Sequence, residues 1–117
     1  MKHHQHLDLN YLNTMAADDE ELKKELMVML LDEMGRCLPE MRRFWNAEQW
    51  FSLQQLCHHT KSTLIYCGNQ IVIQANAALE EGLKDNSKKK ALLAHLEKME
   101  TFFPIIMQEL KVELEQV

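Results

Sequence analysis

Glycine and proline are scarce in this chain, with three and two copies among 117 residues. These two residue types interrupt helices, whereas Leu, Met, Glu, Lys, Gln and Ala, which favour helix, are abundant. Ile71-Val72-Ile73 is the only β-like run. The composition therefore predicts an all-α protein.

A basic excess and a long apolar segment are also missing. The formal net charge is −5, and no basic stripe is interleaved with aromatic residues, which argues against nucleic-acid binding. No apolar run approaches the roughly 20 residues of a membrane span, and the first ten residues lack the apolar part of a secretory signal. We expect a cytoplasmic protein that binds neither nucleic acid nor membranes.

The residues that commonly bind metals do not form a convincing site. Three cysteines are an odd number without zinc-type spacing, which favours buried, reduced thiols. The cluster His3, His4 and His6 is able to bind a metal ion, but we interpret residues 1–6 as a mobile tail with incidental affinity. The paired Glu-x-x-His motif of di-iron bundles is absent. We expect no metal and no other cofactor.

Apolar residues recur with the period of a helix along most of the chain. The pattern predicts a short helical turn at 7–12 and a long helix from 18–21 to about 45, bent at Pro39. It further predicts helices over 49–67, 71–83 and 87–114, with Gly82 ending the third and Pro104 bending the last. The expected core residues are Leu22, Leu26, Met29, Leu30, Met34, Cys37, Ile71, Ile73, Ala75, Ala78, Leu79, Leu92, Leu93, Leu96, Met99, Phe103, Ile106 and Leu110.

Short turns between four amphipathic helices are typical of an up-down-up-down antiparallel four-helix bundle. The length of the chain suits a single domain over residues 1–117. A bundle with a complete core has little need to dimerise, so we expect a monomer. The sequence leaves open whether it is a free-standing protein or one domain of a hybrid kinase.

The predicted helix 49–67 carries two adjacent histidines that fall on different faces. At 100° per residue, the core face contains Leu53, Leu56, Cys57, Thr60, Leu64 and Cys67. His58 lies outward with Lys61 one turn beyond it, in the same sector as Gln54, Ser62 and Ile65. His59 lies on the opposite flank with Gln55 and Tyr66. The helical phase therefore selects His58 over His59.

This arrangement suits a phosphoryl carrier. A neutral imidazole has an unshared nitrogen that can attack phosphorus, and Lys61 can neutralise part of the charge that the phosphate brings. The small Ser62 leaves room for a partner, which Gln54 and Ile65 can contact. No acidic cluster for Mg²⁺ and no glycine-rich phosphate loop accompany these residues. The helix can therefore carry a phosphoryl group, but we expect no autonomous ATP-dependent kinase activity.

Residues 57–68 resemble the signature of histidine-containing phosphotransfer (HPt) domains. In that signature a small residue precedes the histidine, a lysine and a small residue follow, and a glycine stands ten places after the histidine. Cys57, His58, Lys61, Ser62 and Gly68 occupy these positions. The segment Leu38-Pro39-Glu40-Met41 and the turn before Trp50 also resemble the family. Two departures are Ser62, where glycine is commonest, and Thr60, where leucine is usual; the Thr60 hydroxyl is expected to bond back to the preceding turn.

The resemblance implies a phosphorelay intermediate of two-component signal transduction. His58 would accept a phosphoryl group through Nε2 from a receiver-domain aspartate and pass it to a second receiver. The implied partners are response-regulator receiver domains, which carry the Mg²⁺, and a hybrid sensor histidine kinase.

Three other interpretations stay open. His59 is a second potential acceptor. The chain could instead be a non-catalytic adaptor that sequesters a receiver or kinase domain. It could also be a purely structural or dimerisation module, for which changes at His58 would be silent. Eight methionines are compatible with a promiscuous groove, although most occur at core spacing.

Overall fold

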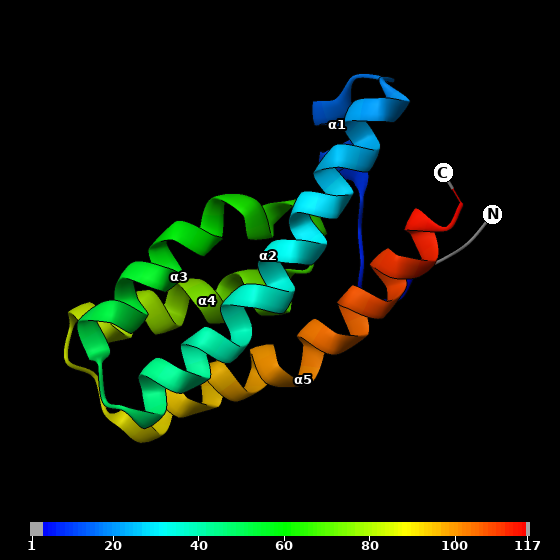
Figure 1. Cartoon of the computed structure of the whole chain (residues 1–117). Helices are drawn as coiled ribbons and strands as arrows, with labels where there is room; N and C mark the ends of the chain where they lie inside the picture. The colour runs from blue at the N-terminus through cyan, green and yellow to red at the C-terminus, as the bar shows by residue number, and fades with distance from the viewer. Residues whose placement is uncertain (1–3, 117) are drawn as a thin grey trace.

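The computed structural model describes residues 4–116, which form helices joined by short turns and contain no strand (Figure 1). The prediction of an all-α protein is confirmed. The elements are α1 (Asn10–Ala16), α2 (Glu20–Asn46), α3 (Trp50–Leu64), the 3₁₀ turn η1 (Ile65–Cys67), α4 (Gln70–Lys84) and α5 (Lys89–Leu114). Pro39 and Pro104 lie inside α2 and α5, and both helices continue past them as expected.

The helices begin where side chains can satisfy free backbone amides. Asp19 caps α2, because its carboxylate accepts a hydrogen bond from the Leu22 amide at 3.0 Å. Asn69 caps α4 in the same way, with its side-chain oxygen 3.1 Å from the Val72 amide. Between α3 and α4, Gly68 adopts a left-handed conformation with φ of 67°. These two residues fix the sharp turn that follows the histidine helix.

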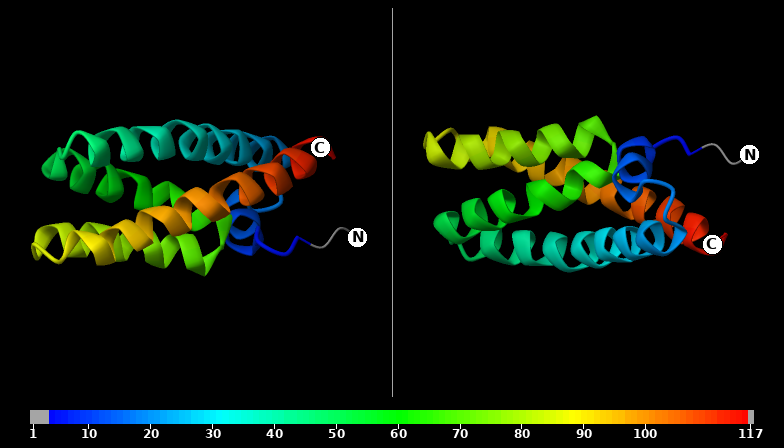
Figure 2. Two further views of the ribbon diagram at one scale, coloured as in Figure 1. Left: turned by 90° about the horizontal axis from the view of Figure 1, so that it is seen from below. Right: turned by 90° about the horizontal axis from the view of Figure 1, so that it is seen from above.

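The four long helices pack in a closed ring. α2 contacts α3 and α5, and α4 contacts the same two helices from the other side, while α1 packs on α2 and η1. Successive long helices run in opposite directions (Figure 2). The resulting body measures 43 × 21 × 19 Å and encloses one core. Its largest fully buried side chains include Phe103, Met34, Leu53 and Leu79.

The core face of α2 is rotated slightly from the predicted one. Met27 is fully buried although it was not expected in the core, whereas Met29 is 40% exposed. Met41, which continues the apolar pattern beyond Pro39, is fully buried. Leu22 and Leu26 are half-buried. Apolar residues occur on more than one side of this helix, so spacing alone does not identify the face that meets α3 and α5.

The predicted core face of α4 is wrong in part. Ile71 is 44% exposed, and Val72 takes the buried position beside it. Asn76 and Glu80 are buried in the same stripe as Ala75 and Leu79. The three consecutive β-branched residues at 71–73 are equally apolar and conceal the helical phase. The buried polar pair becomes important below.

The sequence predicts that Gly82 ends its helix, and this prediction is wrong. α4 continues to Lys84, and Gly82 is buried against α5. A Cβ atom on Gly82 would lie 2.2 Å from Leu92 Cδ2. The glycine is therefore required for the close approach of two helices rather than for a stop. In α5 the predicted core is correct except for the half-buried Leu93.

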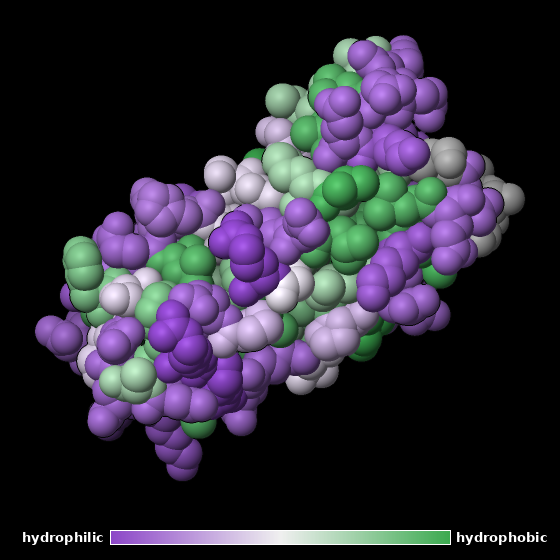
Figure 3. Space-filling view, in the orientation of Figure 1, coloured by the Kyte–Doolittle hydropathy of each residue, from purple (hydrophilic) through white to green (hydrophobic). Residues whose placement is uncertain are grey.

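Residues 4–6 belong to the segment expected to be a mobile tail, and they make specific contacts. Residues 4–6 lie along α5, with hydrogen bonds to Glu109 and Glu113. His3 lies outside the described residues. On the surface, an apolar area extends between the N-terminal half of α2 and the C-terminal half of α5 (Figure 3). Exposed apolar side chains on these helices include Val28, Met29 and Ile105.

Candidate functional site

α3 places His58 and Lys61 on its outer face, one turn apart. The side chains of both residues are 53% exposed. Ser62 and Ile65 are also exposed, and Gln54 is half-buried one turn before the histidine. The predicted site residues therefore share one surface, next to the seam between α3 and α4.

The side chain that holds His58 comes from α4 and was not predicted. Glu80 Oε2 lies 2.9 Å from His58 Nδ1, and the Glu80 side chain is only 5% exposed. A carboxylate can only accept, so the neutral imidazole donates its proton from Nδ1. The lone pair of the neutral ring is therefore on Nε2, the nitrogen that this hydrogen bond does not engage.

Two lysines surround the same carboxylate. Lys61 Nζ lies 3.7 Å from Glu80 Oε1, and Lys84 Nζ lies 3.3 Å from Glu80 Oε2. Burial by itself would raise the pKa of the Glu80 carboxyl. The hydrogen bonds from His58 and Lys84 and the charges of the two lysines outweigh burial and hold that pKa below its usual value. With two ammonium groups and one carboxylate, the site keeps a surplus positive charge.

A second contact fixes the backbone at this point. Asn76 Nδ2 donates to the carbonyl oxygen of Cys57 at 3.0 Å. Asn76 lies one turn before Glu80 on α4, so the two side chains hold α3 at Cys57 and His58. Both are buried. Orientation of the imidazole thus depends on two polar side chains within the apolar stripe of α4.

Thr60 does not form the bond expected from its sequence position. Its side chain is fully buried, and Oγ1 makes no hydrogen bond to the preceding turn but faces the Cys37 thiol of α2. The expected bond to the preceding helical turn is therefore wrong. Asn76 Oδ1 is buried without a partner in residues 4–116.

His59 has a different environment from His58. Its side chain is exposed, and its ring packs edge-on against His58 with the centroids 6.0 Å apart. No carboxylate of the described chain lies within ion-pair distance of it. Of these two histidines, His58 is the one that combines solvent access with a fixed ring orientation.

A small hollow lies beside Lys61. It has a volume of about 120 Å³ and is lined mainly by apolar side chains of η1 and α4, with Leu64 of α3. Ile65, predicted to contact a partner, forms part of its wall together with Ile73 and Ala77. The surface near His58 therefore offers an apolar recess next to an ammonium group.

The three thiols are not available for chemistry at this surface. Cys37, Cys57 and Cys67 are unpaired and fully buried. Burial raises the pKa of Cys37 and Cys67 to about 11. Burial, with the negative charge of Glu80, raises the pKa of Cys57 to about 12.

Within residues 4–116, no group of three or more His, Cys, Asp or Glu side chains is placed to hold a metal ion. None of the described helices combines the length and the apolar character that crossing a membrane requires. Comparisons with protein-family models, curated proteins and solved structures give no match for this chain.

One signal for the missed residues is present in the sequence. Asn76 and Glu80 interrupt an otherwise apolar stripe at a spacing of four, which places both on the face that enters the core. A carboxylate in such a position requires a partner from another helix. Lys84, four residues beyond Glu80, is one such partner.

Proposed function

We propose that this chain is a phosphorelay intermediate that carries a phosphoryl group on His58. The observation that carries the proposal is the environment of the imidazole: Nδ1 is bonded to the buried Glu80, while the side chain remains half exposed to a partner. This combination defines one reactive nitrogen, Nε2, in a fixed orientation. It is what a nucleophile needs to approach phosphorus in line.

The transfer step uses groups that are already in place. The Nε2 lone pair of His58 attacks the phosphorus of an aspartyl phosphate, the bond between phosphorus and the aspartate oxygen breaks, and the aspartate leaves as a carboxylate. The ring becomes positively charged while Nδ1 keeps its proton. Glu80 stabilises that charge through the 2.9 Å hydrogen bond, as an orienting carboxylate does for other catalytic histidines.

The two lysines favour the phosphorylated state. A phosphoryl group brings between one and two negative charges, and Lys61 and Lys84 supply two positive charges around Glu80. Lys61 is one turn from His58 on the same helix, so it is placed to bind a phosphoryl oxygen. Ser62 leaves space above the ring for the partner, while Gln54 and Ile65 provide contacts beside it.

The resemblance of residues 57–68 to HPt domains supports the same role. It is compatible with reading α2 to α5 as an up-down-up-down antiparallel four-helix bundle that acts as a cytoplasmic monomer. The partners would be response-regulator receiver domains, which supply the Mg²⁺, and a hybrid sensor histidine kinase as the first source of phosphate. The chain itself would add no ATP-dependent kinase activity and would need no cofactor of its own.

The test is transfer from a receiver domain labelled on its aspartate. Receiver domains from the same organism are phosphorylated, freed of donor and mixed with the wild-type chain, His58→Gln or His59→Gln. We expect acid-labile, alkali-stable label on the wild type and on His59→Gln, and none on His58→Gln. Label on His58→Gln with loss of label from His59→Gln would show that His59 is the acceptor and that our assignment to His58 is wrong.

The same experiment separates the adaptor alternative. An adaptor that only sequesters a receiver or kinase domain would bind the receiver and acquire no acid-labile phosphate. Binding of the wild type without label, unchanged in His58→Gln, would therefore replace the phosphorelay proposal. A structural module would neither bind the receiver nor become labelled.

A further inference from the structure

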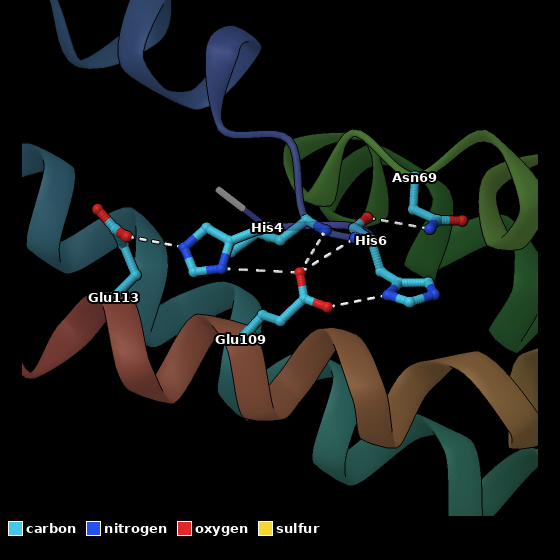
Figure 4. A network of polar contacts seen from close by, with 6 residues as sticks. His4, His6, Asn69, Glu109 and Glu113 are labelled. Atoms are coloured by element: carbon cyan, nitrogen blue, oxygen red, sulfur yellow. Dashed lines mark hydrogen bonds and ion pairs between the residues drawn. The ribbon is translucent and has the colours of Figure 1, made fainter. Parts of the chain in front are cut away.

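The N-terminal strap, residues 4–9, is attached to the rest of the molecule by a polar network (Figure 4). The backbone amides of His6 and Leu7 both donate to Glu109 Oε1, at 3.1 and 3.0 Å. Asn69 Nδ2 donates to the His6 carbonyl oxygen at 2.9 Å, and the Asp8 amide donates to the Cys67 carbonyl oxygen at the same distance. The strap thus joins α5 to the turn after the histidine helix.

These backbone contacts do not depend on the charge of a histidine. Amide protons donate to Glu109 whether or not an imidazole is protonated. The His6 ring adds a bond from Nδ1 to Glu109 Oε2 at 2.9 Å, which a neutral ring can also make. The middle of the strap is therefore held over the whole range in which Glu109 is ionised.

His4 is placed differently, because both of its ring nitrogens face carboxylates. Nε2 lies 2.9 Å from Glu113 Oε2, and Nδ1 lies 3.7 Å from Glu109 Oε1. A neutral imidazole carries one N–H and one lone pair, so it can donate to only one of these carboxylates. Its other nitrogen would then turn a lone pair toward a negative oxygen. Only the imidazolium form suits both contacts.

We propose that the N-terminal strap is a proton-sensitive clasp, in which protonated His4 bridges Glu109 and Glu113 and fastens residues 4 and 5 to α5. Loss of the His4 proton loosens residues 4 and 5 and leaves the strap attached at His6 and Leu7. This inference is independent of the phosphoryl-transfer proposal, since none of these residues contacts the His58 site.

The charged contacts of the His4 and His6 rings are all with carboxylates, which favour a positive charge on the rings. In the described chain, the charged groups within ion-pair distance of the two rings are Glu109 and Glu113, both from α5. Asn69 donates to the His6 backbone oxygen, and the His6 ring lies near Phe102, with the ring centroids 5.8 Å apart. All four side chains of the His–Glu network are largely buried, so water screens their charges less than at an open surface.

The pH dependence has two limbs. Contacts that need the imidazolium form are present while the ring holds its second proton and are lost as the pH rises and that proton leaves. Burial would raise the pKa of Glu109, but the amides of Leu7 and His6 and the His6 ring lower it below its usual value. The carboxylate contacts are therefore lost only as the pH falls through that lowered pKa. The clasp is closed in mildly acidic solution.

The test is nuclear magnetic resonance of the ¹⁵N-labelled full chain between pH 5 and pH 8.5. We expect the heteronuclear NOE of the Gln5 amide to fall as the pH rises, while that of Leu7 stays constant. The ring nitrogens of His4 should titrate over the same interval as the Gln5 amide. The ratio of attached to detached conformations of residues 4 and 5 should change roughly two- to five-fold, as expected for an ion pair near a surface.

Three variants make the result decisive. His4→Gln cannot become charged, so it should abolish the pH dependence at Gln5. Glu113→Gln removes one of the two carboxylates and leaves Glu109, so it should weaken the pH dependence. Glu115→Gln, at an exposed residue of the same helical end, serves as the control and should retain it. A Gln5 amide that is equally ordered at both pH values, or a pH dependence that persists in His4→Gln, would overturn the proposal.

Discussion

The chain pairs histidine with a buried or half-buried glutamate in two places, and the two pairs have opposite consequences. At the α3–α4 seam, Glu80 engages Nδ1 of His58 and leaves the side chain 53% exposed. At the N-terminus, His4 has a carboxylate at each nitrogen and is only 13% exposed. A hydrogen bond to a glutamate therefore leaves His58 open to a partner, whereas at His4 the glutamates occupy both nitrogens.

The comparison teaches which feature identifies an acceptor. An adjacent carboxylate fixes the ring and its tautomer, but it does so in both places. What distinguishes His58 is a second nitrogen that a partner can reach, together with ammonium groups that can meet incoming charge. His4 has a carboxylate at each nitrogen, and the His6 side chain is 25% exposed against 53% for His58, so both N-terminal rings are less open to a partner.

Removing one histidine at a time tests most directly whether the two regions have separate functions. We expect His58→Gln to abolish the acid-labile phosphate, because no other described histidine combines a ring bonded to a carboxylate with a side chain that is more than half exposed. His6→Gln is the matched variant, since it also removes an imidazole bonded to a glutamate. It should be labelled like the wild type. Loss of label from His6→Gln in a folded protein would show that the two regions are not functionally separate.

A substitution at the turn between the two regions should have the next largest effect. A Cβ atom on Gly68 would lie 2.2 Å from the Asp8 carbonyl oxygen, and its φ of 67° disfavours other residues. We expect Gly68→Ala to lower the free energy of unfolding by about 2–4 kcal/mol, from the left-handed backbone and the clash with the strap. Chemical denaturation measures this change.

The control for this substitution is Gly35→Ala. Gly35 lies in α2, where a Cβ atom would meet only the flexible end of Met107 at 3.1 Å. Alanine favours the helix interior by roughly 0.5–1 kcal/mol, so this variant should be as stable as the wild type or more so. Equal losses in the two variants would contradict the assigned role of the turn.

Replacing the two carboxylates tests what each hydrogen bond contributes to transfer. Glu80→Gln removes the charge that stabilises the phosphorylated ring, and we expect the transfer rate to fall by about 10- to 100-fold. Glu109→Gln should leave the rate unchanged, because Glu109 contacts only the strap. Rapid-quench measurement with a labelled receiver compares the rates. An unchanged rate in Glu80→Gln would show that Glu80 is only structural.

The lysine effect should be the smallest. Lys61→Ala removes one of two exposed ammonium groups, and a charge at such a site contributes little in water. We expect a two- to five-fold slower transfer and a shorter phosphohistidine lifetime, with the difference shrinking at high salt. Identical lifetimes in Lys61→Ala and the wild type would exclude a role for its charge. Lys84→Ala tests whether the second lysine contributes through Glu80.

The sequence predicts the helices well because their apolar residues repeat over many turns. Even the prolines of α2 and α5 did not obscure the pattern, since the apolar rhythm continues on both sides. α4 was harder, because Ile71, Val72 and Ile73 are all apolar and only packing decides which one faces inward. Gly82 was misinterpreted for a related reason: its value comes from Leu92, which belongs to another helix.

The candidate site was predictable only as far as one helix carries it. His58 and Lys61 lie three residues apart, so helical geometry relates them without knowledge of the rest of the fold. Glu80 is 22 residues from His58, and its role depends on how α3 and α4 pack. The strap contacts span more than 100 residues, from His6 to Glu109, and no local pattern announces them.

The modification rates of the three buried thiols report local unfolding of the helices that cover them. Thiol reagents attack the thiolate, and with pKa values of about 11 to 12 and no solvent access these cysteines react only after local unfolding exposes them. Cys57 precedes His58 directly, so its modification rate follows the detachment of the acceptor helix from the core. Partner binding at that helix would become visible as a slower reaction at a residue that the partner never touches.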